Sequence, residues 1–146
     1  MSDAPRELLF VTAALLDQGR TVDRLSCALT AAAFAVMAIL PALAPNLQWT
    51  HFGFAAAAVL AGLVQTYFAI RTGLDAALFR RTARTEDFAA IDGALAALGL
   101  VPAGKLGRPS AARIAGARAL LRWQILALAV QILCVLIAAV VALTNR

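Results

Sequence analysis

Long stretches of the sequence carry no charged side chain, and this feature restricts the fold more than any other. No Lys, Arg, Asp or Glu occurs between Arg24 and Arg71, and a second charge-free stretch separates Arg122 from Arg146. The chain has 146 residues, 62% of them hydrophobic, and a mean hydropathy of +0.83. A soluble domain is about 45–50% apolar. The excess is too large for a core of this size, so lipid must be the solvent for much of the surface.

Three segments within these stretches are long enough to cross a membrane, which takes about 20 apolar residues in a helix. They are residues 25–44, 52–70 and 124–144. An outer turn at 45–51 joins the first two, and residues 145–146 form a short outer tail. The sequence therefore predicts an all-α integral membrane protein with three transmembrane helices and no β-sheet.

The amino-terminal segment, residues 1–24, is predicted to hold an amphipathic helix at residues 5–18. Ser2 or Asp3 can cap this helix, and Gly19 can end it. A charge cluster follows where a signal peptide has its cleavage site, so the segment is not a signal peptide. We expect the helix to lie on or near the membrane. Its main apolar stripe consists of Leu8, Val11 and Leu15, widened by Leu9 and Leu16.

Basic residues are unevenly distributed among the segments outside the spans. Residues 1–24 hold three Lys or Arg, residues 45–51 none, residues 71–123 nine and residues 145–146 one. Because positive loops stay in the cytoplasm, we expect a cytoplasmic amino terminus and a periplasmic or extracellular carboxyl terminus. Twelve Arg against one Lys, with abundant Ala, Leu and Gly, indicate a GC-rich bacterial genome. The predicted location is therefore a bacterial inner (plasma) membrane.

The cytoplasmic segment, residues 71–123, reads as helical. Span two continues into it, and Thr85 is placed to cap a second helix that ends at Gly99. That helix has an apolar stripe of Phe88, Ile91, Leu95 and Leu98. Ser110 is predicted to cap a third helix, in which Ile114, Ala117 and Leu121 face one way. The three helices are expected to pack as a compact cap.

Arginines near the membrane ends of this segment are candidates for contact with anionic phospholipids. Such lipids attract Lys and Arg close to the cytoplasmic surface by about 1 kcal/mol each. The candidates are Arg71, Arg80, Arg81, Arg84, Arg118 and Arg122.

Gly99, Gly104 and Lys105 match the spacing of a nucleotide-binding P-loop, G-x-x-x-x-G-K. A true P-loop follows a strand, and its Lys precedes a Ser or Thr that holds magnesium. Here the preceding segment is helical and Leu106 follows the lysine. We therefore expect a turn between two helices, and neither a nucleotide nor a nucleic acid as partner.

No set of residues supports catalysis or a metal. His51, the single histidine, lies in the outer turn without a carboxylate to orient it. Asp92 and Gly93 match only part of the D-x-x-D-G motif of membrane phosphatidyltransferases, and the other aspartates are absent. Cys27 and Cys134 sit at different depths, which argues against a disulfide. We expect no catalytic, cofactor-binding or metal site.

Polar residues inside the spans form a predicted layer. Gln65 and Gln131 each lie roughly 10 Å from the cytoplasmic side, given a rise of 1.5 Å per residue, and Thr30 and Thr66 fall near the same depth. One interpretation is interhelical hydrogen bonding, with Gln65 facing Gln131. The other is a polar path, although paths for ions or protons usually contain ionisable groups.

Three functions remain open at the level of sequence. The first is a small non-enzymatic membrane protein that anchors, scaffolds or regulates a complex, with a protein partner or further copies of itself. The second is an oligomeric pore or transport-associated component. The third is a small enzyme acting on lipid, whose basic residues would hold phosphate.

Overall fold

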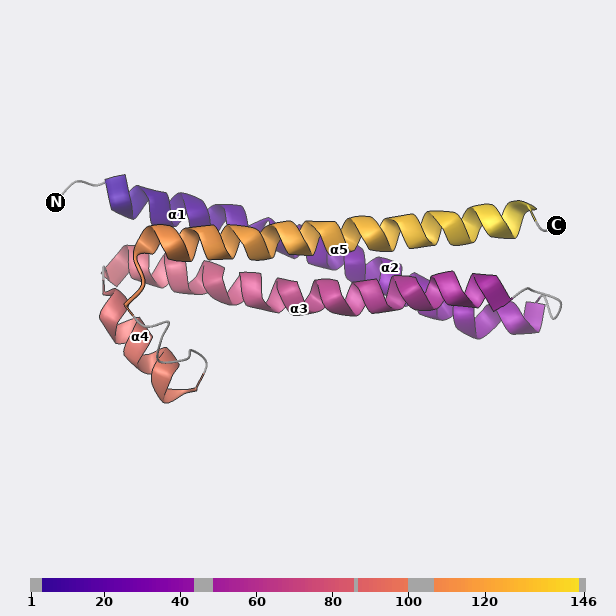
Figure 1. Cartoon of the computed structure of the whole chain (residues 1–146), viewed down its shortest axis with the longest axis horizontal. Helices are drawn as coiled ribbons and strands as arrows, with labels where there is room; N and C mark the ends of the chain where they lie inside the picture. The colour runs from indigo at the N-terminus through magenta and orange to yellow at the C-terminus, as the bar shows by residue number, and fades with distance from the viewer. Residues whose placement is uncertain (1–3, 44–48, 86, 100–106, 145–146) are drawn as a thin grey trace.

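The computed structural model describes residues 4–43, 49–85, 87–99 and 107–144. No strand occurs in these residues, which confirms the all-helical prediction. The long helices lie side by side in an elongated bundle (Figure 1). They are α1 (Ala4–Asp17), α2 (Gly19–Leu43), α3 (Trp49–Thr85), α4 (Phe88–Ala97) and α5 (Ser110–Thr144).

Three helical stretches are long and apolar enough to cross a membrane: Arg6–Ile39, Phe52–Thr85 and Ser110–Thr144. With 37 residues in α3 and 35 in α5, these helices extend about 50–55 Å at 1.5 Å per residue. The hydrocarbon of a bilayer is only about 30 Å thick. The surplus of roughly 20 Å leaves room for a packed extension at the end where α4 lies (Figure 1). We call this extension the stalk; it comprises α1, residues 71–85 of α3 and residues 110–123 of α5.

Interior positions recur at alternating intervals of three and four residues in all three long helical stretches. In α3 this series runs from Ala55 to Ala83 through Gly62 and Gln65, and in α5 from Ile114 to Val135. A repeat of 3.5 residues keeps one seam of each helix facing its partners when the helices wind around each other with a left hand. The same arrangement is common among membrane helices. The heptad pattern therefore gives one continuous bundle from the stalk to the opposite end.

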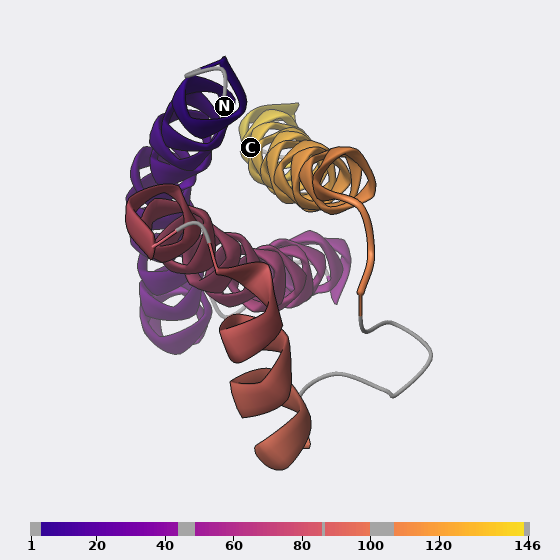
Figure 2. The same cartoon turned by 90° about the vertical axis from the view of Figure 1, so that its left-hand side faces the viewer.

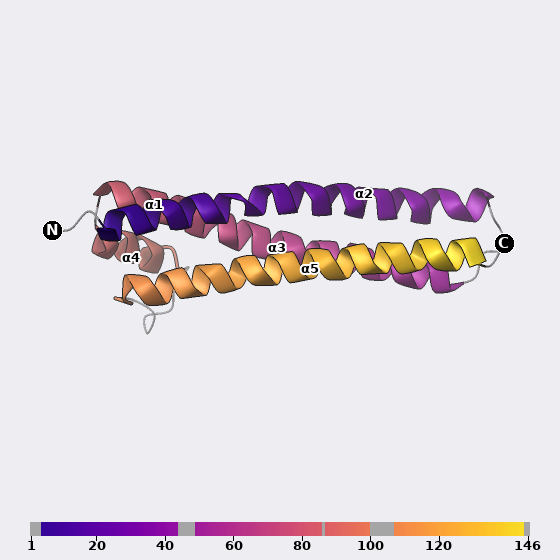
Figure 3. The same ribbon diagram turned by 90° about the horizontal axis from the view of Figure 1, so that it is seen from above.

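Two hydrogen bonds show that α2 and α5 run parallel. The Gln124 side chain donates to the Gly19 carbonyl at 2.7 Å, and the Gln131 side chain donates to the Ser26 carbonyl at 3.2 Å. From the first bond to the second, the residue number increases by seven in both helices. The two helices therefore run in the same direction and share a heptad repeat. α3 returns in the opposite direction beside both of them (Figure 3).

Helix α1 continues almost along the line of α2 (Figure 3). Gln18 is the one non-helical residue between them, and its carbonyl accepts from the backbone of Thr21 and Val22. Gly19 begins α2 and does not end α1, contrary to the sequence prediction. A Cβ at Gly19 would lie 2.8 Å from Oε1 of Gln124. The glycine is therefore needed for close helix contact and not to stop a helix.

The buried face of α1 differs from the stripe that the sequence suggested. Leu9, Ala13 and Leu16 are buried, whereas Leu8, Val11 and Leu15 remain exposed. The three buried residues join an apolar cluster in the stalk that includes Phe79 of α3 and Leu121 of α5. All these α1 positions are apolar, so the pattern alone could not show which part of the face meets the bundle.

Helix α4 projects from the side of the bundle (Figure 2). Its amino-terminal cap is Asp87, whose side chain accepts from the backbone of Ala90 at 2.9 Å; the predicted cap, Thr85, is the last residue of α3. Gly99 follows the helix with a φ of +66°, which confirms the predicted stop. The Pro109 carbonyl accepts from Arg113, so Ser110 is the first residue of α5 and not its cap. Gly104 and Lys105 lie outside the described residues.

Candidate functional site

A hydrogen-bonded group inside the bundle joins α2 to α5. The Ser26 hydroxyl donates to Oε1 of Gln131 at 2.6 Å, and the Gln131 amide nitrogen lies 2.9 Å from Oγ1 of Thr30. The Thr30 hydroxyl in turn donates to the Ser26 carbonyl at 2.9 Å. Ser26 and Gln131 are fully buried. Interhelical bonds of this kind contribute about 0.6–2 kcal/mol each in a membrane, so this group holds the two helices in one register.

Gly62 of α3 completes the enclosure of this group. A Cβ at position 62 would lie 2.8 Å from the amide nitrogen of Gln131 and would overlap the Thr30 hydroxyl. The backbone of α3 therefore approaches the polar side chains as closely as a residue without a side chain allows. We refer to Ser26, Thr30, Gly62 and Gln131 as the glutamine clamp.

The structure brings together only part of the predicted polar layer. Thr30 and Gln131 are hydrogen bonded, but Gln65 is not paired with Gln131. Gln65 is fully buried, and both polar atoms of its amide lack a partner among the described residues. Thr66 is half-buried, beside Gln65 in the sequence. The similar depths of these residues predicted the layer. Which side chains form hydrogen bonds depends on which heptad positions of the helices face each other.

Three further polar side chains line the interior one heptad closer to the stalk, outside the layer that the sequence predicted. Gln124 is fully buried and donates to Gly19. The remaining acceptor of Gln124, Oδ1 of Asp23 and Oγ1 of Thr72 are all buried without a partner among the described residues. One signal was available: Gln124 and Gln131 are separated by seven residues, as are Gly19 and Ser26.

A small cavity lies among these residues. It has a volume of about 40 Å³, and Gly19, Asp23 and Thr72 contribute to its wall. A site needs roughly 10–15 Å³ of such volume to hold a water molecule. A single water could accept from the Thr72 hydroxyl and donate to Asp23. The wall also contains two ionisable residues, Arg20 and Asp23.

Apolar clusters bound the polar region on both sides. Toward the end remote from α4, Ala33, Ala58 and Val59 are buried together, with Met37 packed against them. Toward the stalk, the cluster that includes Leu16 and Phe79 closes the interior. The polar region is therefore an enclosed layer within the described bundle.

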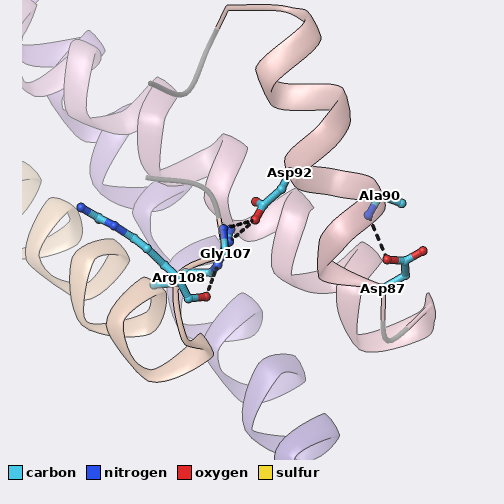
Figure 4. A network of polar contacts seen from close by, with 6 residues as sticks. Asp87, Ala90, Asp92, Gly107 and Arg108 are labelled. Atoms are coloured by element: carbon cyan, nitrogen blue, oxygen red, sulfur yellow. Dashed lines mark hydrogen bonds and ion pairs between the residues drawn. The ribbon is translucent and has the colours of Figure 1, made fainter. Parts of the chain in front are cut away.

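A second polar group fastens α4 to α5 in the stalk (Figure 4). Asp92 accepts from the Arg113 guanidinium at 2.6 Å and from the Gly107 backbone at 2.9 Å. These two hydrogen bonds hold the pKa of Asp92 below its usual value of 3.8. The Arg113 guanidinium also lies 5.3 Å from the ring centre of Phe88. Asp92 therefore belongs to a structural ion pair that connects α4 with α5.

The predicted α4 stripe is only partly buried. Ile91 is buried, Phe88 packs against the stalk cluster and Leu95 is half-buried, but Leu98 is exposed. A cavity of about 330 Å³ lies between α3, α4 and α5. Its wall includes Phe88, Leu95 and Arg71.

The candidate lipid-contacting arginines lie on the stalk and at its junction with the rest of the bundle. Arg80 pairs with Asp17 at the end of α1. The other five side chains are exposed, as lipid contact would require. They are Arg71, Arg81, Arg84, Arg118 and Arg122.

Within the described residues, no three or more His, Cys, Asp or Glu side chains gather as metal ligands, and Cys27 and Cys134 are free thiols. His51 lies in the first turn of α3. No protein-family model, no curated protein and no solved structure matches the chain. Function can therefore be inferred only from the geometry of this chain.

Proposed function

We propose that the chain is a non-enzymatic, three-span protein of a bacterial inner membrane that anchors or scaffolds a larger membrane assembly, or regulates it. One observation carries this proposal: α3 and α5 run without a break from an apolar, lipid-compatible stretch into the stalk. A rigid helical connection of this kind transmits position and orientation from the bilayer to a partner. Such a connection fits an anchoring role and needs no catalytic residues.

The orientation follows from charge. The stalk end carries almost all basic residues, and positive segments stay in the cytoplasm. We therefore place α1, α4 and the stalk on the cytoplasmic side and the carboxyl terminus on the outer side. The exposed arginines of the stalk that lie nearest the bilayer, such as Arg71 and Arg122, would then contact anionic phospholipids.

The experiment is affinity purification of the tagged full-length chain from native membranes, with quantitative mass spectrometry. It compares the wild type with Phe88→Asp, which should detach α4 because Phe88 packs against the stalk cluster. Ala89→Asp adds the same charge at an exposed neighbour and serves as the matched control. We expect a partner in stoichiometric amount with the wild type and Ala89→Asp, and its loss with Phe88→Asp.

Trypsin digestion of inside-out vesicles checks that Phe88→Asp has detached α4, since the stalk arginines then become easier to cleave. If the wild type brings no protein down in stoichiometric amount, the anchoring role is wrong. If Phe88→Asp detaches α4 but the partner is still recovered, α4 does not contribute to partner binding.

A transport-associated role is the second candidate. The observation that favours it is the buried Oδ1 of Asp23, a residue that lines a small cavity inside the bundle. The apolar cluster around Ala58 argues against transport, because this cluster closes the route from the polar layer toward the outer side. Ion flux into vesicles reconstituted with the pure chain, abolished by Asp23→Asn, would favour transport over anchoring.

A further inference from the structure

The helical stretch formed by α1 and α2 has a second apolar seam, and its own bundle leaves all of this seam exposed except Val22 and Leu29, which are half-buried. The seam occupies positions 8, 11, 15, 18, 22 and 25, and the same alternation of three and four residues continues to position 39. Every position but Gln18 is apolar. Leu8, Val11 and Leu15 are 54%, 63% and 45% exposed. We call this seam the outer stripe.

The outer stripe is distinct from the seam that faces the bundle. The bundle seam passes through Leu9, Leu16 and Ser26, whereas the outer stripe lies on a neighbouring face of the same helix. A seam repeating every 3.5 residues is what a partner helix needs for continuous packing in a left-handed coil. Contact with lipid requires no such period. In residues 8–22, which also hold polar and charged side chains, the stripe therefore has the pattern of a helix–helix interface.

In the orientation proposed above, the stalk portion of the stripe lies outside the bilayer. Because α1 continues the line of α2 (Figure 3), Leu8 lies about 25 Å before Leu25 along the helix, at 1.5 Å per residue. The exposed Arg20 and Arg24 stand between them. Three large apolar side chains in a row in water mark an interaction surface.

We propose that a second copy of the chain covers the outer stripe, so that two copies associate in parallel through α1 and α2. The inference rests on the membrane insertion proposed above, which gives every copy the same orientation. A two-fold axis along the membrane normal then sets the stripe of one copy against the same stripe of the other.

Size and chemistry both fit a second copy. The stretch Arg6–Ile39 is 34 residues long, or about 50 Å, and a helix is about 10–12 Å wide. The contact strip is roughly 500–600 Å² per copy, which in total reaches the approximately 1,000 Å² of a specific interface. Gln18 carries both a donor and an acceptor, so two copies of it satisfy each other across the axis. One polar residue in an apolar seam also fixes register.

The flanking positions permit close approach. Ala14 and Thr21 lie beside the stripe on the side away from the bundle, and both are small and exposed. The charged residue at the same flanking position in α1 is Glu7 at the start of the helix, and no basic side chain flanks the stripe there. The stripe thus combines an apolar seam with small neighbours.

The first test is disulfide cross-linking of the full-length chain in native membranes, in a Cys27→Ala, Cys134→Ala background. Under mild oxidation, Val11→Cys and Leu15→Cys should shift the chain from 15.2 kDa to twice that mass. Arg81→Cys, exposed on α3 of the stalk, is the matched control and should stay at the monomer mass. No shift, an equal shift with Arg81→Cys, or a shift to another mass would overturn the proposal.

A second test uses two differently tagged copies expressed together, with recovery of one tag and detection of the other. The double variant Val11→Glu, Leu15→Glu should lose this association, whereas Arg81→Glu should keep it. Both changes are on exposed side chains, so the fold should survive. Retained association in the double variant refutes the proposed surface. An alkaline wash of the same membranes shows separately whether the chain is inserted, so failure of insertion is distinguished from failure to pair.

Discussion

Gly62→Ala tests the glutamine clamp with the smallest possible change. The added methyl group would overlap the Thr30 hydroxyl and lie 2.8 Å from the Gln131 amide nitrogen. Overfilling a packed interior costs about 1–3 kcal/mol, and each lost interhelical bond costs about 0.6–2 kcal/mol. Alanine returns up to about 1 kcal/mol through its higher helix propensity. We therefore expect the free energy of unfolding to fall by about 1–3 kcal/mol.

Gly73→Ala, on the same helix, is the matched control, because a Cβ there meets no atom within 4 Å. It keeps the propensity gain without the clash, so the free energy of unfolding should rise by up to about 1 kcal/mol. The assay is unfolding of the pure chain in bicelles by titration with SDS, followed by far-ultraviolet circular dichroism. Equal shifts of the midpoint in the two variants would refute the close approach of α3 to the clamp.

A double-mutant cycle assigns the effect to the Thr30 side chain. Thr30→Ala removes the hydroxyl that the new methyl group would meet, so Gly62→Ala should cost less in that background than in the wild type. We expect a coupling energy of at least about 1 kcal/mol, within the range seen for residues in contact. If the two changes are additive, the methyl group does not act through Thr30.

Two further predictions concern side chains in the interior and the stalk. Gln131→Leu should lower the free energy of unfolding by about 1–3 kcal/mol, because it leaves Ser26 without its acceptor. Gln65→Leu removes two atoms that have no partner among the described residues, and it should not lower the free energy of unfolding. The reverse order of stability in the same SDS titration would show that the partners are misassigned. Because the pKa of Asp92 is lowered in the folded chain, its ion pair stabilises α4 fully above about pH 3.8 and stops doing so as the pH falls through the folded-state pKa. Protection of the α4 amides from hydrogen exchange, corrected for intrinsic rates, should fall in the wild type as the pH drops through this range. In Asp92→Asn, α4 should be less protected at neutral pH, and its protection should not change over the same range.

Local sequence patterns were sufficient for the helices and for the stalk stripe on α5. Ile114, Ala117 and Leu121 pack in the stalk cluster as their spacing predicted. The cap of α4 was harder to predict. Thr85 and Asp87 are both good caps two residues apart, and only the extension of α3 through Thr85 decides between them.

The partners inside the bundle could not be predicted, since a hydrogen bond between helices depends on their relative register. Gln65 and Gln131 have matched depths, yet Gln131 bonds to α2 because the heptad seams set it against Ser26. The sequence prediction left Asp23 outside the first span because it is charged. In the structure, its Oδ1 is buried inside the bundle. The seven-residue spacing that Gln124 and Gln131 share with Gly19 and Ser26 was the signal that could have revealed the pairing.

We infer that the bundle spans a membrane with the stalk in the cytoplasm. Labelling of single cysteines with a membrane-impermeant maleimide tests it most directly, in right-side-out vesicles and a Cys27→Ala, Cys134→Ala background. Ser110→Cys and Thr144→Cys lie at the two ends of α5 and are both exposed. We expect Thr144→Cys to be labelled in intact vesicles and Ser110→Cys to be labelled only after permeabilisation. Labelling of both in intact vesicles, or the reverse pattern, would contradict it.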